Sequence, residues 1–288
     1  MTELHCSPAH SLYSKDDTCY SDEDIVNIAK SYNKITQNKD KIILSNNKKK
    51  IHSDLKTRLK NKCGDKETCW LEQDFIDYNL KKELEDAFRP KKPLEWYTNN
   101  KTWLNTYDIL FVMEQYEKKY TDFVFLGVHS IDFEQKNSNG NCIGDTMCTF
   151  NIKQLFNKKK NQFGIVVNTD PHNKGGQHWF AIYCSLNPQK NNFGIFYYDS
   201  VAFPIEKEMK IFMNNIKQQV ISHFSKDISS KFIIDYNKHR KQYKNTECGI
   251  FSIVFLTQCL KYIEFKDICK RMRTDDDINK LRDVLYRT

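Results

Sequence analysis

The chain has 288 residues, 39% of them hydrophobic, and its 45 Lys and Arg exceed its 37 Asp and Glu to give a formal net charge of +8. This length suits one large domain or a domain with a smaller accessory one. No stretch approaches the 18 or more apolar residues of a membrane span, and the N-terminus lacks the basic and apolar regions of a secretory signal, so we expect a soluble, intracellular protein with no membrane partner.

Residues 1–95 are polar and have helical periodicity. Ser21 and the three acidic residues after it are typical of a helix N-cap and first turn. Apolar residues spaced four apart over 51–59 predict a second helix. Pro90 and Pro93 interrupt any helix, so we place a domain boundary near residue 95.

The pattern of residues 96–288 is mixed. Five short segments rich in β-branched and aromatic residues are bounded by Gly, Asn, Pro or Asp, which is typical of strands. Amphipathic or apolar spacing predicts helices around them. The predicted strands are 123–128, 164–167, 179–184, 193–198 and 231–236, and the predicted helices are 104–116, 205–224, 248–262 and 275–285. We therefore expect an α+β core with a small central sheet and helices packed on it.

Cys248 has the sequence setting of a nucleophilic cysteine. Residues 245–247, Asn-Thr-Glu, are typical of a helix start, Gly249 allows close backbone approach, and 250–256 is an apolar helix body. A thiol at the positive end of that helix is favoured as a thiolate, the form that attacks a carbonyl carbon. The alternative is a buried cysteine that acts only in packing, which is a common role of free cysteine.

His178 and Asp199 are the candidate base and the candidate group that orients it. His178 stands in Gly-Gly-Gln-His-Trp-Phe at the start of one predicted strand, and Asp199 follows another in Phe-Tyr-Tyr-Asp-Ser. A carboxylate can hold an imidazole and stabilise its charged form. The alternatives are a structural or surface histidine and a strand-terminating aspartate. His172 is a second candidate base, but its Asp-Pro-His-Asn context is typical of a surface turn.

Gln242 lies six positions before Cys248, where its amide can donate to the oxyanion of a tetrahedral intermediate. Taken alone, it reads as an exposed polar residue. The joint order of His-Trp, then Asp, then Gln six residues before Cys-Gly indicates one site, in which Cys248 attacks a peptide or isopeptide carbonyl.

This order resembles that of the adenain-like cysteine proteases, a group with a papain-like core that contains the adenovirus maturation protease and the SUMO-deconjugating enzymes. The resemblance covers roughly residues 96–288. It implies a cysteine endopeptidase without a cofactor, with a catalytic triad of His178, Asp199 and Cys248. It also implies that Gln242 supports the oxyanion hole.

The segment Trp103-Leu104-Asn105 is similar to the Trp-Leu-Asn-Asp motif of that family. By this resemblance, Trp103 and Trp179 cover a narrow tunnel through which a Gly-Gly segment reaches the thiol. Residues without a Cβ fit between two indoles, although core packing is the alternative role of both tryptophans. Thr106 replaces the final Asp of the motif, which affects the expected contacts with ubiquitin-like substrates more than catalysis.

Residues 1–95 are similar to the arm domain of polyprotein-processing proteases of large cytoplasmic DNA viruses, the African swine fever virus type. This resemblance implies a helical N-terminal arm and cleavage of structural precursors after Gly-Gly-X sites during virion maturation. The implied location is the virus factory of the host cytoplasm and the virion. The alternative is an isopeptidase that removes SUMO or another ubiquitin-like modifier, and a catalytically silent binding module is a third reading.

The cysteines and the net charge bear on cofactors and partners. We expect reduced thiols, because disulfide frameworks belong mainly to short secreted chains. Cys6, His10, Cys19, Cys63 and Cys69 can be drawn as a zinc site, but they lack paired Cys-x-x-Cys spacing, so we expect no metal. The net charge of +8 makes DNA a candidate activator or guide, although the basic residues are scattered.

Overall fold

The structure is a computed structural model that describes residues 6–9 and 18–288. The chain divides into two compact units. The N-terminal unit runs to Lys91 and also includes Val284–Thr288, and the sheet unit is Lys92–Asp283. The boundary predicted from the sequence puts 284–288 in the sheet-containing core instead. The difference arises because Arg287 is bound to the N-terminal unit, through its backbone N–H to Pro90 O at 2.8 Å and its Nε to Arg89 O at 2.9 Å.

The N-terminal unit is helical. Its helices are α1 Asp22–Ile35, α2 Lys48–Cys63 and α3 Tyr78–Glu85, with short 3-10 turns at Asn38–Asp40 and Glu67–Glu72. The first two were predicted and α3 was not. Helix α1 begins at a capping box, in which Asp24 N donates to Ser21 Oγ at 3.1 Å and Ser21 N donates to Asp24 Oδ2 at 2.8 Å. Buried apolar residues of α1 and α2 pack around Trp70, on which Tyr20 stacks at 5.6 Å.

Six of the ten cysteines form disulfides, so the prediction of reduced thiols is wrong for them. Their Cα atoms lie 5.0 to 5.8 Å apart, within reach of a disulfide. Only folded geometry decides this pairing, because these spacings match no framework motif. Two of the bonds use four of the five residues of the zinc alternative, and the fifth, His10, lies outside the described residues. The pairs are Cys6–Cys19, Cys63–Cys69 and Cys142–Cys148, and the free thiols are Cys184, Cys248, Cys259 and Cys269.

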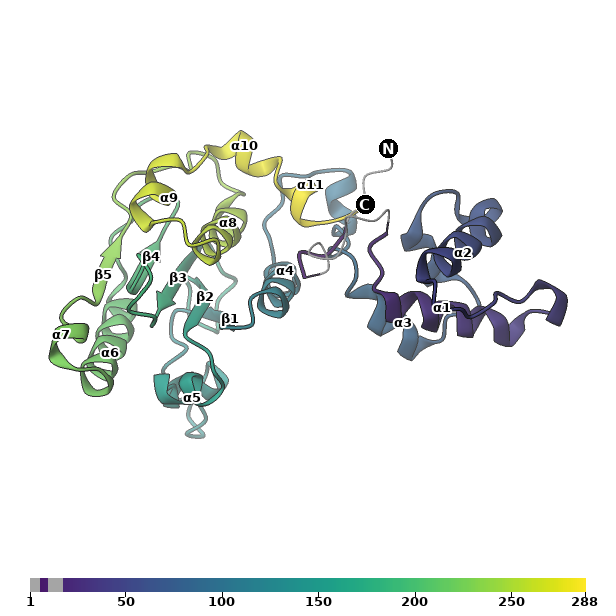
Figure 1. The fold of residues 1–288 in the computed structure, drawn as a ribbon. Coiled ribbons are helices and arrows are strands. Elements are labelled where there is room, and N and C mark those ends of the chain that lie inside the picture. Colours follow the sequence, from purple (N-terminus) through teal and green to yellow (C-terminus); the bar gives the residue numbers. More distant parts are fainter. Residues whose placement is uncertain (1–5, 10–17) are drawn as a thin grey trace. The chain divides into compact units, whose positions relative to one another are not determined.

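A five-stranded mixed sheet forms the centre of the sheet unit, with its strands in chain order (Figure 1). The first and last strand pairs are parallel, and the two inner pairings are antiparallel. All five predicted strands are present, which confirms the α+β class. The strands are β1 Phe123–Ser130, β2 Gln162–Asn168, β3 Trp179–Ser185, β4 Gly194–Tyr198 and β5 Ile233–Tyr236.

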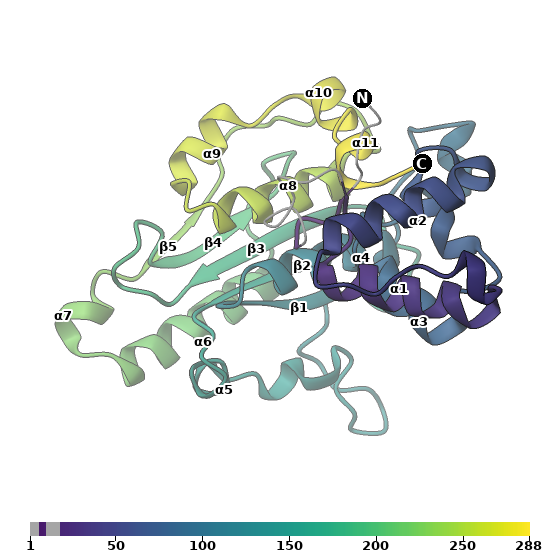
Figure 2. The same ribbon diagram turned by 45° about the vertical axis from the view of Figure 1, so that its right-hand side comes forward.

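Helices cover both faces of this sheet (Figures 1 and 2). On one face, α6 Lys207–His223 packs its apolar residues into a core with alternate residues of β2, β3 and β4. On the other face lie α4 Thr106–Lys119 and α8 Cys248–Leu260. Gly164 of β2 makes room for α8, because a Cβ there would lie 3.0 Å from Leu256 Cδ2. Gly164 thus allows α8 to pack closely on the sheet, and this packing sets the position of Cys248 at the start of the helix.

Several helix predictions need correction. Leu104 precedes α4 instead of joining it, because Asn105 is the N-cap. The predicted helix 275–285 is two short helices, since i→i+3 hydrogen bonds from Leu281 N and Asp283 N replace the regular helical pattern between them. Among the described residues, no helix has the length and apolarity of a membrane span. The remaining elements are α5 Ile152–Asn157, α7 Lys226–Ser229, α9 Phe265–Arg271, α10 Asp275–Asn279, α11 Arg282–Leu285 and 3-10 turns at Leu94–Tyr97 and Asp145–Thr149.

Candidate active site

Cys248 is the first residue of α8, as the sequence predicted. Only 2% of the residue is exposed, and the helix that follows is buried along almost its whole length. The thiol therefore lies at the positive end of a 13-residue helix, which favours a negative charge there. Gly249 faces the segment before α4, where a Cβ would lie 3.0 Å from Leu104 Cβ. This confirms the predicted close approach at Gly249.

His178 and Asp199 meet at one end of the sheet. Strand β3 begins just after His178 and β4 ends just before Asp199. Because β3 and β4 are antiparallel, the start of one strand lies beside the end of the other. His178 Nε2 and Asp199 Oδ1 are 3.0 Å apart, and Val201 N donates to the same oxygen at 2.7 Å. The carboxylate is 1% exposed, so it is held in one position.

His178 is also hydrogen-bonded to the side chain of Cys248, which brings the predicted nucleophile, base and orienting group together. Burial by itself lowers the pKa of His178. The hydrogen bonds to Asp199 and Cys248, together with the charges of both groups, outweigh burial and raise this pKa to about 10. Since Nε2 faces Asp199, the other ring nitrogen is left for the thiol. Both partners therefore stabilise the protonated ring, and a protonated imidazole beside a cysteine favours the thiolate, the form that attacks a carbonyl.

Asn237, which was not predicted as a site residue, holds Asp199 in place. Its Oδ1 accepts from Asp199 N at 2.8 Å and its Nδ2 donates to Asp199 O at 2.6 Å. The side chain of Asn237 is buried, at 2% exposure. The sequence signal is that Asn237 directly follows the predicted strand 231–236. Because β5 is parallel to β4, the carboxyl end of β5 lies beside Asp199. The sequence alone gave neither the pairing nor its direction.

Gln242 is buried, at 2% exposure, and not an exposed polar residue. Its Oε1 accepts from Ser200 Oγ at 2.5 Å, and its Nε2 donates to Lys244 O at 2.7 Å. Its backbone N–H donates to the carbonyl oxygen of Ser200, the residue after Asp199, at 2.9 Å. The amide group has a second N–H for an oxyanion, but the role in the oxyanion hole stays a prediction.

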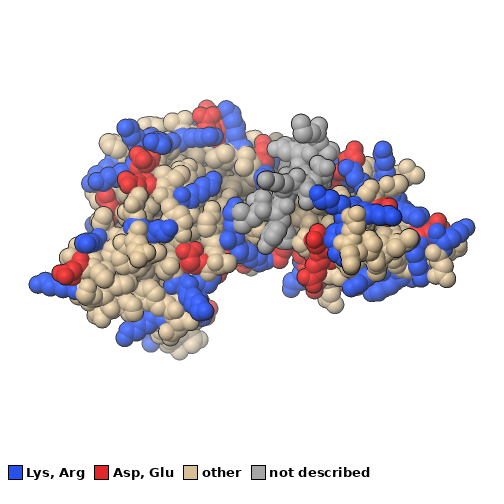
Figure 3. All heavy atoms as spheres, viewed as in Figure 1, with Lys and Arg blue, Asp and Glu red and all other residues tan. Residues whose placement is uncertain are grey.

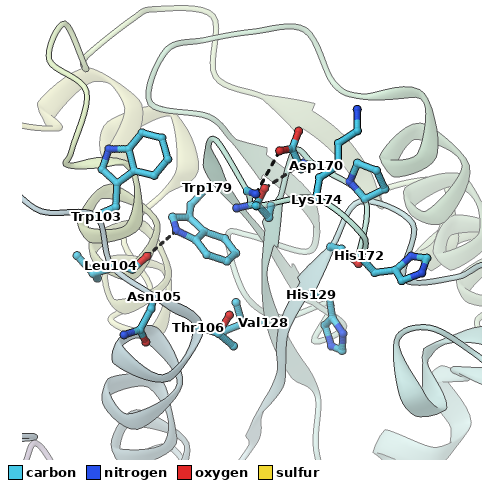
Figure 4. Close-up of a pocket in the computed structure, with 15 residues that line it drawn as sticks. Trp103, Leu104, Asn105, Thr106, Val128, His129, Asp170, His172, Lys174 and Trp179 are labelled. Carbon is cyan, nitrogen blue, oxygen red and sulfur yellow. Dashed lines mark hydrogen bonds between the residues drawn. The ribbon is translucent and has the colours of Figure 1, made fainter.

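Trp103 and Trp179 line one cavity of about 390 Å³, Trp103 from the segment before α4 and Trp179 from the start of β3 (Figure 4). Trp179 Nε1 donates to Leu104 O at 2.9 Å, which ties the start of β3 to the residue after Trp103. Trp103 is 45% exposed, so core packing does not account for it. The opposite wall of the cavity is formed by 168–176, the loop that leads to His178. Both tryptophans thus line one cavity, and Trp179 directly follows His178, the predicted base.

His172, the second candidate base, has another partner. Its Nδ1 lies 2.6 Å from Asp132 Oδ2, and its side chain is 49% exposed on the cavity wall. Figure 4 shows it across the cavity from Trp103. The predicted surface role of His172 therefore agrees with its contacts. The choice of His178 as base is supported by its hydrogen bonds to both Asp199 and Cys248.

The surface charge is mixed. On the face shown in Figure 3, Lys and Arg are spread over both units among acidic and neutral residues. This matches the scattered basic residues of the sequence. The groups suited to acyl transfer, Cys248, His178 and Asp199, instead lie together at one end of the sheet.

The known proteins to which this chain is similar are proteases. The model of the Ulp1 protease family, C-terminal catalytic domain, matches residues 102–287. The thiol protease R355 of Acanthamoeba polyphaga mimivirus is 27% identical over 301 residues, covering 98% of this chain and 93% of the mimivirus protein. The SUMO-1 cysteine protease S273R of African swine fever virus is 27% identical over 261 residues, covering 83% of this chain and 90% of its own.

The crystal structure of the African swine fever virus pS273R protease has the same fold. It superposes with a TM-score of 0.67 at 20% identity, covering 98% of this chain and 95% of the viral protease. The likeness therefore extends over the helical N-terminal region as well as the sheet.

Proposed function

The chain belongs to the Ulp1 protease family and is a cysteine protease, and we propose that it cleaves precursors of virion structural proteins after Gly-Gly-X sites during virion maturation. The observation that carries the proposed specificity is the cavity that Trp103 and Trp179 line beside His178. Similarity to viral proteases over nearly the whole chain, including the N-terminal unit, supports a viral precursor as the substrate.

Acyl transfer uses the three central residues in turn. The Cys248 thiolate forms a bond to the carbonyl carbon, and the carbonyl electrons move to oxygen, which accepts a hydrogen bond from Gln242 in this proposal. The C–N bond then breaks, and the His178 imidazolium gives its proton to the leaving amine. Water attacks the resulting thioester while His178 takes its proton. The C–S bond breaks, which releases the carboxylic acid and restores the thiolate and imidazolium. Asp199 keeps the ring oriented throughout.

The preference for glycine follows from the cavity. Both indoles line the cavity, and Trp179, the residue after His178, is fixed by its hydrogen bond to Leu104 O. In our proposal, the substrate segment lies against these two aromatic rings. Glycine has no Cβ and adopts extended or left-handed backbone equally well, so a Gly-Gly segment fits where larger residues clash.

A deconjugating isopeptidase for SUMO is the second candidate. It would use the same residues, and the African swine fever virus relative carries SUMO-1 in its name. Thr106 stands where the family motif has Asp, which favours the precursor over a ubiquitin-like protein. The two functions differ in the substrate, since one requires a folded modifier and the other an extended Gly-Gly-X site.

A Gly-Gly vinyl sulfone probe tests the reaction class. It should form an adduct on Cys248 of the wild-type protein and none in Cys248→Ala, measured by mass spectrometry after digestion. Absence of an adduct on the wild-type protein would overturn the protease proposal. Comparing Gly-Gly-X peptides with a SUMO conjugate then separates the two substrates. Efficient cleavage of the conjugate alone would replace virion maturation by deconjugation.

The proposal also places the protein in the virus factory of the host cytoplasm and in the virion. DNA is included as an activator because of the net charge of +8. Peptide turnover measured with and without short duplex DNA, at 50 and 200 mM salt, tests this part. Activation that disappears at the higher salt concentration supports it, and unchanged turnover removes DNA from the proposal.

A further inference from the structure

The segment between Gln242 and Cys248 is held by residues close to the C-terminus. Tyr243 N donates to both oxygens of the Asp275 carboxylate, at 2.8 and 3.1 Å, and Lys244 N donates to it at 3.2 Å. Asp275 is 5% exposed and is the first residue of α10. A buried carboxylate that accepts several backbone N–H groups fixes the path of that backbone. The start of the segment is therefore anchored to α10.

The end of the same segment is anchored by Asn279, also on α10. Glu247, the residue before Cys248, is only 1% exposed, and its carboxylate accepts from Thr246 N at 3.1 Å and Thr246 Oγ1 at 2.7 Å. Asn279 Nδ2 donates to Glu247 Oε1 at 3.3 Å and to Asn100 O at 3.2 Å. One amide group thus connects the residue before the nucleophile with the segment that leads to Trp103.

Arg282 makes the same connection more strongly. Its Nη2 donates to Thr102 O at 2.7 Å and to Thr246 O at 3.0 Å, and the guanidinium lies 4.4 Å from the centroid of the Trp96 ring. The side chain is 2% exposed. Thr102 is adjacent to Trp103, and Thr246 is two residues before Cys248. A planar guanidinium with both hydrogen bonds on one nitrogen sets the separation of these two carbonyls narrowly.

We propose that Asp275, Asn279 and Arg282 form a C-terminal brace that positions the Cys248 thiol relative to the Trp103 side of the substrate cavity. Arg282 is the main positioning residue, because of the three it alone binds both segments by charge-assisted hydrogen bonds. The inference rests on the proposed function, since it concerns the register between the thiol and a substrate that passes Trp103. A displacement of about 1 Å at such a site can lower turnover ~100-fold.

The test compares two reagents that reach the same thiol. Iodoacetamide is small and needs only a reactive Cys248, whereas the Gly-Gly vinyl sulfone must also pass the two tryptophans. In Arg282→Met, which removes the donors and keeps an unbranched side chain, labelling by the vinyl sulfone should fall at least tenfold. Alkylation by iodoacetamide at Cys248 should stay within about threefold of the wild-type rate. Arg282→Lys keeps a donor and should recover part of the loss.

Arg271→Met is the matched control, because Arg271 is 75% exposed and pairs with Asp267 on its own helix, at 3.7 Å. It should label as the wild-type protein does with both reagents. Asn279→Ala removes a smaller, half-buried part of the brace and should lower vinyl sulfone labelling about threefold. It keeps the test decisive if Arg282→Met does not fold, which a thermal melt will show.

Two results would overturn the brace. One is equal vinyl sulfone labelling of wild type and of both brace variants. The other is a parallel loss with both reagents, which would make Arg282 a general stabiliser of the fold. Wild-type labelling reports on the proposed function, and the ratio of variant to wild type reports on the brace, so the two failures are distinguishable.

Discussion

The substitution Asp199→Asn tests whether the buried carboxylate sets the charge state of His178. Burial lowers the pKa of His178, and the contacts with Asp199 and Cys248 raise it from 6.5 to about 10. At 1.36 kcal/mol per pKa unit, this rise corresponds to about 5 kcal/mol in favour of the imidazolium.

 

Asp199 is first among the groups that raise this pKa, so Asp199→Asn should lose a large part of this stabilisation of the imidazolium and slow turnover.

The sign of the effect follows from the raised pKa. The imidazolium is present below the folded-state pKa of His178 and is lost as the pH rises through about 10. Removing the Asp199 charge lowers this pKa, so the imidazolium should be lost at a lower pH than in the wild-type protein. The NMR titration of ¹⁵N-labelled histidine rings measures the pKa directly. The basic limb of kcat/KM against pH should move in the same direction, because the imidazolium protonates the leaving amine.

Asp235→Asn is the control, since Asp235 is on the neighbouring strand β5 and pairs with Lys238 at 4.0 Å. It should leave the His178 titration and the pH profile unchanged. A His178 pKa that stays near 10 in Asp199→Asn would refute the assignment of Asp199 as the partner that holds the charge.

The remaining predictions concern the nucleophile, its oxyanion donor, the clamp on Asp199 and the disulfides. Cys248→Ala should abolish turnover with the fold retained, because a methyl group fits the buried site; a fall of more than about 10 °C in Tm would instead make Cys248 a packing residue. Gln242→Ala should lower kcat about 10²–10³-fold, and equal activity would remove Gln242 from the mechanism. Asn237→Ala should move the basic limb of the pH profile to lower pH, because a less firmly held Asp199 raises the pKa of His178 less. A lower Tm with an unchanged pH profile would contradict this. Thiol titration of the denatured, unreduced protein should count four thiols, and a count of ten would disprove the three disulfides.

The sequence alone was enough to predict the residues of the site and the main helices and strands that carry them. Periodicity located all five strands and the helices α1, α2, α4, α6 and α8, because local spacing of apolar residues decides which face an element can bury. The order of His178, Asp199 and Cys248 predicted a thiolate site, and the structure brings these residues together. Each stands at the end of an element, where a short motif in the sequence already marks it.

The tertiary structure decided what depends on contacts between distant segments. The clamp of Asn237 on Asp199 requires that β5 lie parallel to β4, and neither segment encodes that pairing by itself. The disulfides, the break between α10 and α11 and the hydrogen bonds of Arg282 likewise join residues whose distance along the chain says nothing of their distance in space. Sequence periodicity records which side of an element is buried, whereas the partner on that side is set by sheet order and chain path.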